Sequence, residues 1–171
     1  MVGRSNVGKS SLINALVRKK IARTSAAPGK TRQANYYLLH PPIPNPRSLY
    51  LVDLPGYGYA RGGHDSVETF EQLTQAYFDV STRENRRIVG VLQLVDARHP
   101  GLRQDAVGYS WLLAVQAPIA IVATKVDKLN RSEQVKTLRA LREEYDSPVL
   151  PVSSFEGIGL DEIWKTIRGW L

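Results

Sequence analysis

The sequence predicts an α/β fold, in which helices cover both faces of a doubly wound, mostly parallel sheet of six strands. Strand-like and helix-like segments alternate along the 171 residues, and short connections separate them. Two strand-like segments, residues 88–96 and 118–125, are largely apolar and end in polar residues. Strands buried on both faces of a parallel sheet have this pattern. We find no internal repeat and expect one domain over residues 1–171.

The individual elements follow from residue spacing. Apolar residues recur every three or four positions, as on one face of a helix, in five segments: Leu12–Val17, Val67–Tyr77, Val107–Ala114, Val135–Tyr145 and Leu160–Leu171. Strands are expected at residues 35–39, 48–53, 88–96, 118–125 and 147–154, and the remaining strand should lie directly before residue 3. Turn-forming residues predict connections at residues 24–33, 40–46 and 54–64, the first of them a mobile loop.

Composition favours a globular protein of the cytoplasm. Hydrophobic residues make up 43% of the chain and charged residues 23%, which is ordinary for such proteins. No run approaches the roughly 18 apolar residues of a membrane span, and no secretory leader is recognisable. The lack of cysteine excludes disulfides and thiolate metal sites and is compatible with a reducing compartment.

Positive charge is concentrated in the first third of the chain. The net charge is +7, but residues 1–61 hold ten Lys and Arg against one acidic residue, whereas residues 62–171 hold thirteen against fifteen. A phosphate-binding site needs some of this charge, and some of these side chains are simply solvated. A basic surface that contacts RNA or the ribosome would account for the rest.

Residues 3–11, GRSNVGKSS, match the pattern G-x-x-x-x-G-K-[ST] of a phosphate-binding loop. In such a loop, backbone N–H groups form a nest for phosphate oxygens, and the following helix directs its positive end at the anion. Lys9 would reach the terminal phosphates, and the hydroxyl of Ser10 would bind Mg²⁺. ATPases, kinases and GTPases share this loop, so it does not identify the base.

A second motif, TKVD at residues 124–127, indicates guanine. It follows an apolar strand, and ligands in this fold class bind at the carboxyl ends of the strands. The carboxylate of Asp127 can accept hydrogen bonds from N1–H and the 2-amino group of guanine, a pair of donors that adenine lacks. The stem of Lys125 can cover the base, and the N–H of Ser154 can donate to the guanine oxygen. An ATP-dependent enzyme is disfavoured; the alternative is that Asp127 only caps the next turn.

A third motif, DLPG at residues 53–56, completes the expected site. Asp53 would hold Mg²⁺ through a water molecule, and the N–H of Gly56 would sense the γ-phosphate. Thr31, in the expected mobile loop, would supply a second hydroxyl ligand for Mg²⁺. A γ-phosphate would order both segments and its loss would release them, which is the behaviour of a switch.

Five segments in this order, GRSNVGKSSLINAL, TSxxPGKT, DLPGYGYA, LVDARHP and TKVDKL, resemble the EngB (YihA/YsxC) family of bacterial ribosome-biogenesis GTP-binding proteins, which are TRAFAC-class P-loop GTPases. The resemblance spans nearly the whole chain. It implies weak binding of GTP and GDP, slow GTP hydrolysis and a switch role in assembly of the large ribosomal subunit, with a further link to cell division and septation. We expect a monomer that uses Mg²⁺ and does not contact membranes.

The motifs and the resemblance together assign the residues of the site. Those expected to bind GTP are Gly3, Arg4, Ser5, Asn6, Val7, Gly8, Lys9, Ser10, Ser11, Pro28, Gly29, Lys30, Thr31, Asp53, Leu54, Pro55, Gly56, Thr124, Lys125, Val126, Asp127, Val152, Ser153 and Ser154. Those expected to act in catalysis are Lys9, Thr31 and Asn6.

The group that activates water is less evident. In many GTPases a glutamine after D-x-x-G orients the attacking water, but Tyr57 stands here, so hydrolysis must use another group or a partner. Asn6 is one candidate, because related GTPases use this residue to bind K⁺; alternatively it only accommodates the unusual backbone of the loop. Arg61 and His99 are weaker candidates. An RNA or solvent contact is the favoured interpretation for Arg61, and a structural or partner-surface role is favoured for His99.

Some positions depart from the family pattern. Arg32 and Val126 stand where the family usually has Gln and Ala, and Val126 is expected to face the core. Of the first strand, the chain offers only Met1 and Val2, and a gap at the centre of a sheet exposes strand edges. Either the start lies upstream of Met1 or the chain is a fragment. We expect an N-terminal extension of roughly one to two dozen residues to restore nucleotide binding, since the gap threatens the whole stability of a domain.

Two functions compete at this point. In the first, GTP hydrolysis times release from a ribosomal precursor. In the second, the chain is a ribosome- and rRNA-binding assembly module gated by nucleotide occupancy, and its hydrolysis is incidental. Tyr57 in place of glutamine keeps the second alternative open.

Overall fold

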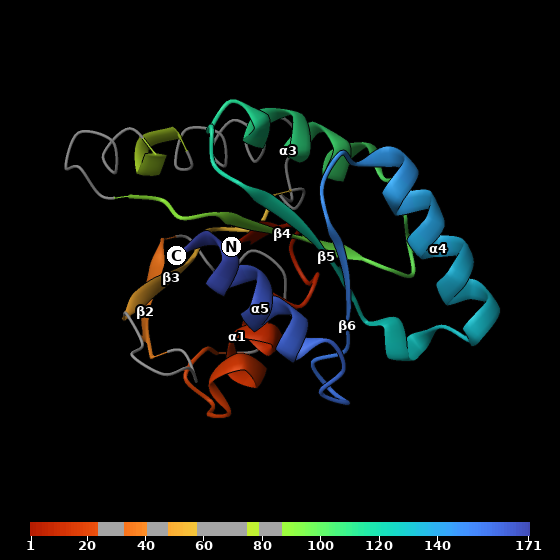
Figure 1. Cartoon of the computed structure of the whole chain (residues 1–171), viewed down its shortest axis with the longest axis horizontal. Helices are drawn as coiled ribbons and strands as arrows, with labels where there is room; N and C mark the ends of the chain where they lie inside the picture. Colours follow the sequence, from red (N-terminus) through yellow and green to blue (C-terminus); the bar gives the residue numbers. More distant parts are fainter. Residues whose placement is uncertain (24–32, 41–47, 58–74, 79–86) are drawn as a thin grey trace.

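A parallel sheet sandwiched between two layers of helices forms the body of the computed structural model, which describes residues 1–23, 33–40, 48–57, 75–78 and 87–171 (Figure 1). The strand order is β1-β4-β5-β6. These strands are β1 (Val2–Gly3), β4 (Val91–Asp96), β5 (Ile119–Thr124) and β6 (Val149–Val152). The helices are α1 (Lys9–Val17), α3 (Arg103–Leu113), α4 (Arg131–Glu144) and α5 (Leu160–Trp170), with a 3₁₀ turn at Val126–Lys128.

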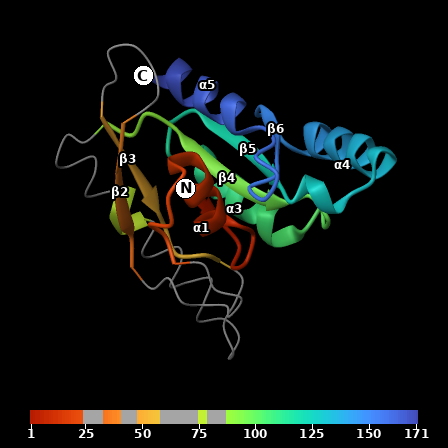
Figure 2. The same ribbon diagram turned by 90° about the horizontal axis from the view of Figure 1, so that it is seen from below.

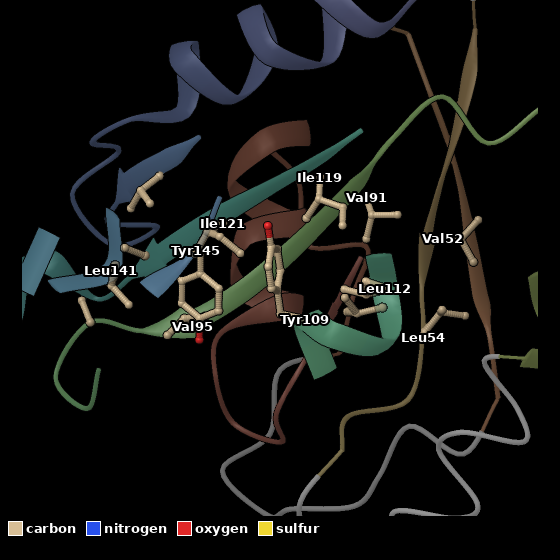
Figure 3. Packing of buried hydrophobic residues seen from close by; sticks show 14 of the residues in the cluster. Val52, Leu54, Val91, Val95, Tyr109, Leu112, Ile119, Ile121, Leu141 and Tyr145 are labelled. Atoms are coloured by element: carbon tan, nitrogen blue, oxygen red, sulfur yellow. The ribbon is translucent and has the colours of Figure 1, made fainter. Parts of the chain in front are cut away.

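Two core clusters follow from the alternation of side chains along the strands. Val91 and Val95 of β4 point to the face covered by α3 and α4, whereas Leu92 and Leu94 point to the face covered by α1 and α5. Figure 3 shows the first cluster, in which Tyr109 of α3 and Tyr145 after α4 lie over the sheet. We predicted from their largely apolar sequences that β4 and β5 are buried on both faces, and this prediction is confirmed.

The remaining strands, β2 (Asn35–Leu39) and β3 (Leu49–Asp53), form an antiparallel pair beside the parallel sheet (Figure 2). We predicted one sheet of six strands. All six are present, but they form two hydrogen-bonded sheets.

The short first strand explains this division. β1 has two residues, and both pair with β4. Only a few hydrogen bonds join the start of the chain to β3 and the residue that follows it. The amino group of Met1 donates to the carbonyl of Val52, and the N–H of Leu54 donates to the carbonyl of Met1 at 3.1 Å.

The other predicted elements differ in detail. Most of the helix predicted at Val67–Tyr77 lies outside the described residues. Residues 75–78, which are described, are helical. The loop predicted at residues 24–33 also lies outside them, except for Gln33. α3 and α4 are confirmed as helices, but Val107 and Val135, which we expected on their buried faces, are 46% and 66% exposed. Within the described ranges, no helix has the length and apolar character needed to cross a membrane.

A cavity of about 790 Å³ lies between β3 and the amino end of β4. Its walls include Leu49 and Leu51 of β3, Leu92 of β4, and Trp170 near the carboxyl end of the chain. Met1 and Val2 also line it, so the cavity continues the line of β1. We expect residues added before Met1 to extend β1 into this space.

Filling this cavity should stabilise the fold. We expect an N-terminal extension of about six apolar, β-branched residues, the length of an ordinary strand, to raise the melting temperature. The rise should be roughly 5–10 °C. Burial contributes about 1.5–3 kcal/mol for each side chain, but ordering each residue costs about 1–2 kcal/mol, so the net gain is roughly 2–3 kcal/mol, and each kcal/mol shifts the midpoint by about 2–4 °C. Thermal unfolding followed by circular dichroism measures the shift. A Gly-Ser extension of equal length is the matched control, and an equal rise with that control would contradict the explanation.

Candidate nucleotide-binding site

The predicted motifs meet at one edge of the sheet. Strands β1, β4, β5 and β6 run parallel, so the segments that follow them lie at a common carboxyl edge. The phosphate loop follows β1, residues 124–127 include the end of β5, and residues 153–154 follow β6. The predicted residues Pro28, Gly29, Lys30 and Thr31 lie outside the described part of the chain.

The phosphate loop has the backbone that its sequence predicts. Asn6 and Gly8 have φ angles of 62° and 113°, in the left-handed region, which glycine and asparagine enter most easily. α1 then begins at Lys9. The side chain of Lys9 folds back over the loop, where its ammonium donates to the carbonyls of Gly3 at 3.1 Å and Arg4 at 3.4 Å. Burial lowers the pKa of Lys9, although Asp53 opposes this shift.

Gly56 lies against the phosphate loop. A Cβ atom at this position would come within 2.8 Å of the backbone nitrogen of Ser5 and 3.0 Å of the Lys9 Nζ atom, so only glycine allows this approach. In addition, the N–H of Ser5 donates to the carbonyl of Tyr57 at 3.1 Å. The structure therefore brings the D-x-x-G segment next to the lysine that was predicted to reach the terminal phosphates.

Asp53 has the features of a residue that awaits a ligand. The residue is 2% exposed, and its Oδ1 atom has no hydrogen-bond partner. Burial raises the pKa of Asp53, while Lys9 and the amino terminus oppose this shift. Buried acceptors normally have partners, so an orphaned carboxylate oxygen fits a hydrated Mg²⁺ ion, which prefers oxygen ligands. In the part of the chain that the structure describes, no group of three or more His, Cys, Asp and Glu could hold a metal.

Residues 124–127, the predicted base-reading segment, are hydrogen-bonded to the phosphate loop. The hydroxyl of Thr124 donates to the carbonyl of Val7 at 2.7 Å and to that of Val95 at 3.1 Å. The ammonium of Lys125 donates to the carbonyl of Asn6 at 2.7 Å. Two predicted parts of the site, distant in sequence, therefore form one hydrogen-bonded unit.

Hydrogen bonds to Asp127 favour the ionised form of its carboxyl group. Burial disfavours its charge, but hydrogen bonds from Ser153 and Lys128 outweigh burial, so the pKa of Asp127 lies below its usual value. Ser153 is fully buried and accepts from the N–H of Glu156, while Ser154 is partly exposed. Val126 is buried, as predicted.

Tyr57 does not lie free in the site. It is buried, and its hydroxyl donates to Asp105 of α3 at 2.9 Å and accepts from Gln93 of β4 at 3.2 Å. The fully buried carboxylate of Asp105 also pairs with Arg4 of the phosphate loop at 3.2 Å. Sequence reasoning placed Arg4 at the nucleotide but missed Asp105 and Gln93. A polar residue within an otherwise apolar β4 was the available signal for Gln93.

The LVDARHP segment also contributes a residue that sequence reasoning did not assign. Asp96 ends β4, where it pairs with both Arg98 and Lys125 at 2.8 Å. His99 is exposed in the turn that follows. Arg61 lies outside the described residues.

Comparison with known proteins agrees with this geometry. Residues 1–125 match the family model described as 50S ribosome-binding GTPase. A probable GTP-binding protein EngB from Syntrophomonas wolfei is 43% identical over 95% of this chain and 81% of the relative. The same protein from Geobacillus sp. strain WCH70 is 39% identical over all of this chain and 86% of the relative.

Solved structures have the same fold. A variant of Aquifex aeolicus Era bound to GDP and AlF₄⁻ matches with a TM-score of 0.79 and 26% identity, over 99% of this chain and 55% of Era. A probable GTP-binding protein EngB matches with a TM-score of 0.71 and 22% identity, over 99% of this chain and 95% of that structure. The family model and the curated relatives cover most of the chain, and its phosphate-loop and base-reading motifs meet at one edge. The chain therefore belongs to the EngB family of GTP-binding proteins and is a GTPase.

Proposed function

We propose that this GTPase is a switch that assists assembly of the large ribosomal subunit in the cytoplasm, and that residues 1–171 form one such GTP-binding domain. The observation that carries the switch is the contact of Gly56 with Ser5 and Lys9. A D-x-x-G segment in this position is displaced or drawn in according to whether a γ-phosphate lies beside Lys9. The family description and the excess of Lys and Arg in residues 1–61 support the ribosomal partner.

The nucleotide would occupy the carboxyl edge of the sheet. Backbone N–H groups of residues 4–11 would surround the phosphates, and Lys9 would neutralise their charge. Asp127 would accept from N1–H and the 2-amino group of guanine, with the N–H of Ser154 donating to its oxygen. Lys125 would cover one face of the base.

Mg²⁺ would be held by the hydroxyl of Ser10 and, through water, by Asp53. The orphaned Oδ1 atom of Asp53 supports this assignment. When bound, the ion would neutralise phosphate charge during hydrolysis. We propose Thr31 as the second hydroxyl ligand.

The buried Tyr57 supports slow intrinsic hydrolysis. Its hydroxyl is held by Asp105 and Gln93, so it does not orient an attacking water molecule as glutamine does in many GTPases. We propose that a K⁺ ion bound by Asn6, or a contact with the ribosomal particle, supplies the missing stabilisation. The left-handed backbone of Asn6 supports the alternative, a purely conformational role for this residue.

The base preference can be tested with Asp127→Asn. We expect the affinity for GDP to fall at least about 100-fold and the affinity for xanthosine diphosphate to rise, because the amide can donate where xanthine has an oxygen. Competition against a fluorescent GDP analogue measures both affinities. Asp161→Asn, an exposed acid on α5, is the matched control. An unchanged preference would show that Asp127 does not read the base.

The role of Asn6 can be separated from its backbone by Asn6→Gly, since glycine adopts the same φ without the amide. We expect hydrolysis by the unaltered chain to be faster in K⁺ than in Na⁺, and the variant to lose this difference. Phosphate release, with and without large ribosomal subunits, measures it. A variant that keeps the stimulation would leave Asn6 with the conformational role. Slow rates under all conditions would favour the alternative function, a nucleotide-gated ribosome-binding module with incidental hydrolysis.

The RNA surface can be tested at Arg18, Lys19 and Lys20, which are exposed after α1. We expect the triple alanine variant to bind large ribosomal subunits more weakly. The slope of log affinity against log salt concentration should become less steep by roughly one for each phosphate that is no longer neutralised. A filter-binding assay at several salt concentrations measures this. The matched control replaces the exposed Arg131, Lys136 and Arg142 of α4. Equal losses of affinity in both variants would argue against a specific surface near α1.

A further inference from the structure

Asp96 occupies a position between the base-reading segment and the phosphate loop. It is the last residue of β4, opposite Thr124 in the register with β5, and it is 4% exposed. Its Oδ1 atom accepts from Arg98 Nε at 2.9 Å. Its Oδ2 atom accepts from the terminal guanidinium nitrogen of Arg98 and from Lys125 Nζ, each at 2.8 Å.

Lys125 is consequently fixed at both ends. Its backbone has a φ of 61°, in the left-handed region, and its ammonium bridges Asp96 and the carbonyl of Asn6. A lysine side chain normally samples many rotamers, and two anchors remove most of that freedom before a ligand binds. The methylene stem is thereby held next to the phosphate loop.

We infer that Asp96 is a positioning residue for guanine-nucleotide binding and acts by holding Lys125 in place. The inference rests on the proposed role of Lys125 at the base. In this inference the LVDARHP segment acts indirectly. Asp96 holds Lys125, and neither Asp96 nor Arg98 is required to contact the nucleotide.

The charges around Asp96 fit this task. Burial disfavours its ionised form, but hydrogen bonds from Arg98 and Lys125 outweigh burial, so the pKa of Asp96 lies below its usual range. The carboxylate therefore stays charged at neutral pH. The exposed Arg98 binds both carboxylate oxygens, and Oδ2 also accepts from Lys125.

A double-mutant cycle on the full chain tests the inference. We expect Asp96→Ala to weaken binding of a fluorescent GDP analogue about tenfold, as expected for the loss of a charge-assisted hydrogen bond, mainly through faster dissociation. In a Lys125→Ala background, Asp96→Ala should have almost no further effect on affinity. Asp96→Ala should still lower the melting temperature in the Lys125→Ala background, because it removes the ion pair with Arg98 whether or not Lys125 is present.

Asp96→Asn provides the second variant, because it keeps the side-chain volume and removes the charge, and it should follow the same cycle if Asp96→Ala does not fold. Asp146→Asn, at an exposed acid after α4, is the control and should leave affinity unchanged. Equal losses in the presence and absence of Lys125 would overturn the inference, and so would unchanged GDP affinity in both Asp96 variants. If the unaltered chain itself did not bind GDP, the proposed function would fail instead.

Discussion

The hydroxyl of Thr124 holds the structure of the site together. It donates to the Val95 carbonyl of β4 and to the Val7 carbonyl of the phosphate loop, so one buried group joins the sheet to the loop. Lys125 repeats the connection one residue later through Asn6. Because β1 pairs with β4 at only two positions, these bonds contribute much of what places the loop. The base-reading segment and the phosphate loop are therefore joined by hydrogen bonds from two successive residues.

A second buried network ties the D-x-x-G segment to α3. Asp105 accepts from Tyr57 and Arg4, and both donors come from segments that border the phosphates. A buried carboxylate is costly unless it is paired, so the loss of either donor would remove one of the partners that compensate Asp105. Tyr57, the residue that follows D-x-x-G, is in this way part of the core.

Local patterns in the sequence were enough to predict the strands and the nucleotide motifs. β4 and β5 are apolar on both faces, and the motifs that follow them have fixed spacing. The buried face of α3 was not predictable in the same way. Apolar periodicity selected Val107, whereas the helix buries Asp105 and Gly108. Asp105 is buried because a tyrosine 48 residues away reaches it, and Gly108 because a Cβ atom there would lie 3.1 Å from the Tyr57 ring. Such pairings depend on tertiary contacts that no local window contains.

The cavity beside β1 and the nucleotide site lie at opposite ends of the same short strand. Met1 and Val2 line the cavity, while the bonds that position the loop begin at Gly3 and involve the carboxyl ends of β4 and β5. An unfilled cavity lowers the free energy of unfolding through lost packing, and that loss is spread over the whole domain. The geometry of the phosphate loop depends instead on hydrogen bonds to neighbouring strands that are complete. The length of the first strand should therefore govern how much of the chain is folded, and the contacts of Thr124 and Lys125 should govern how well the folded chain binds its nucleotide.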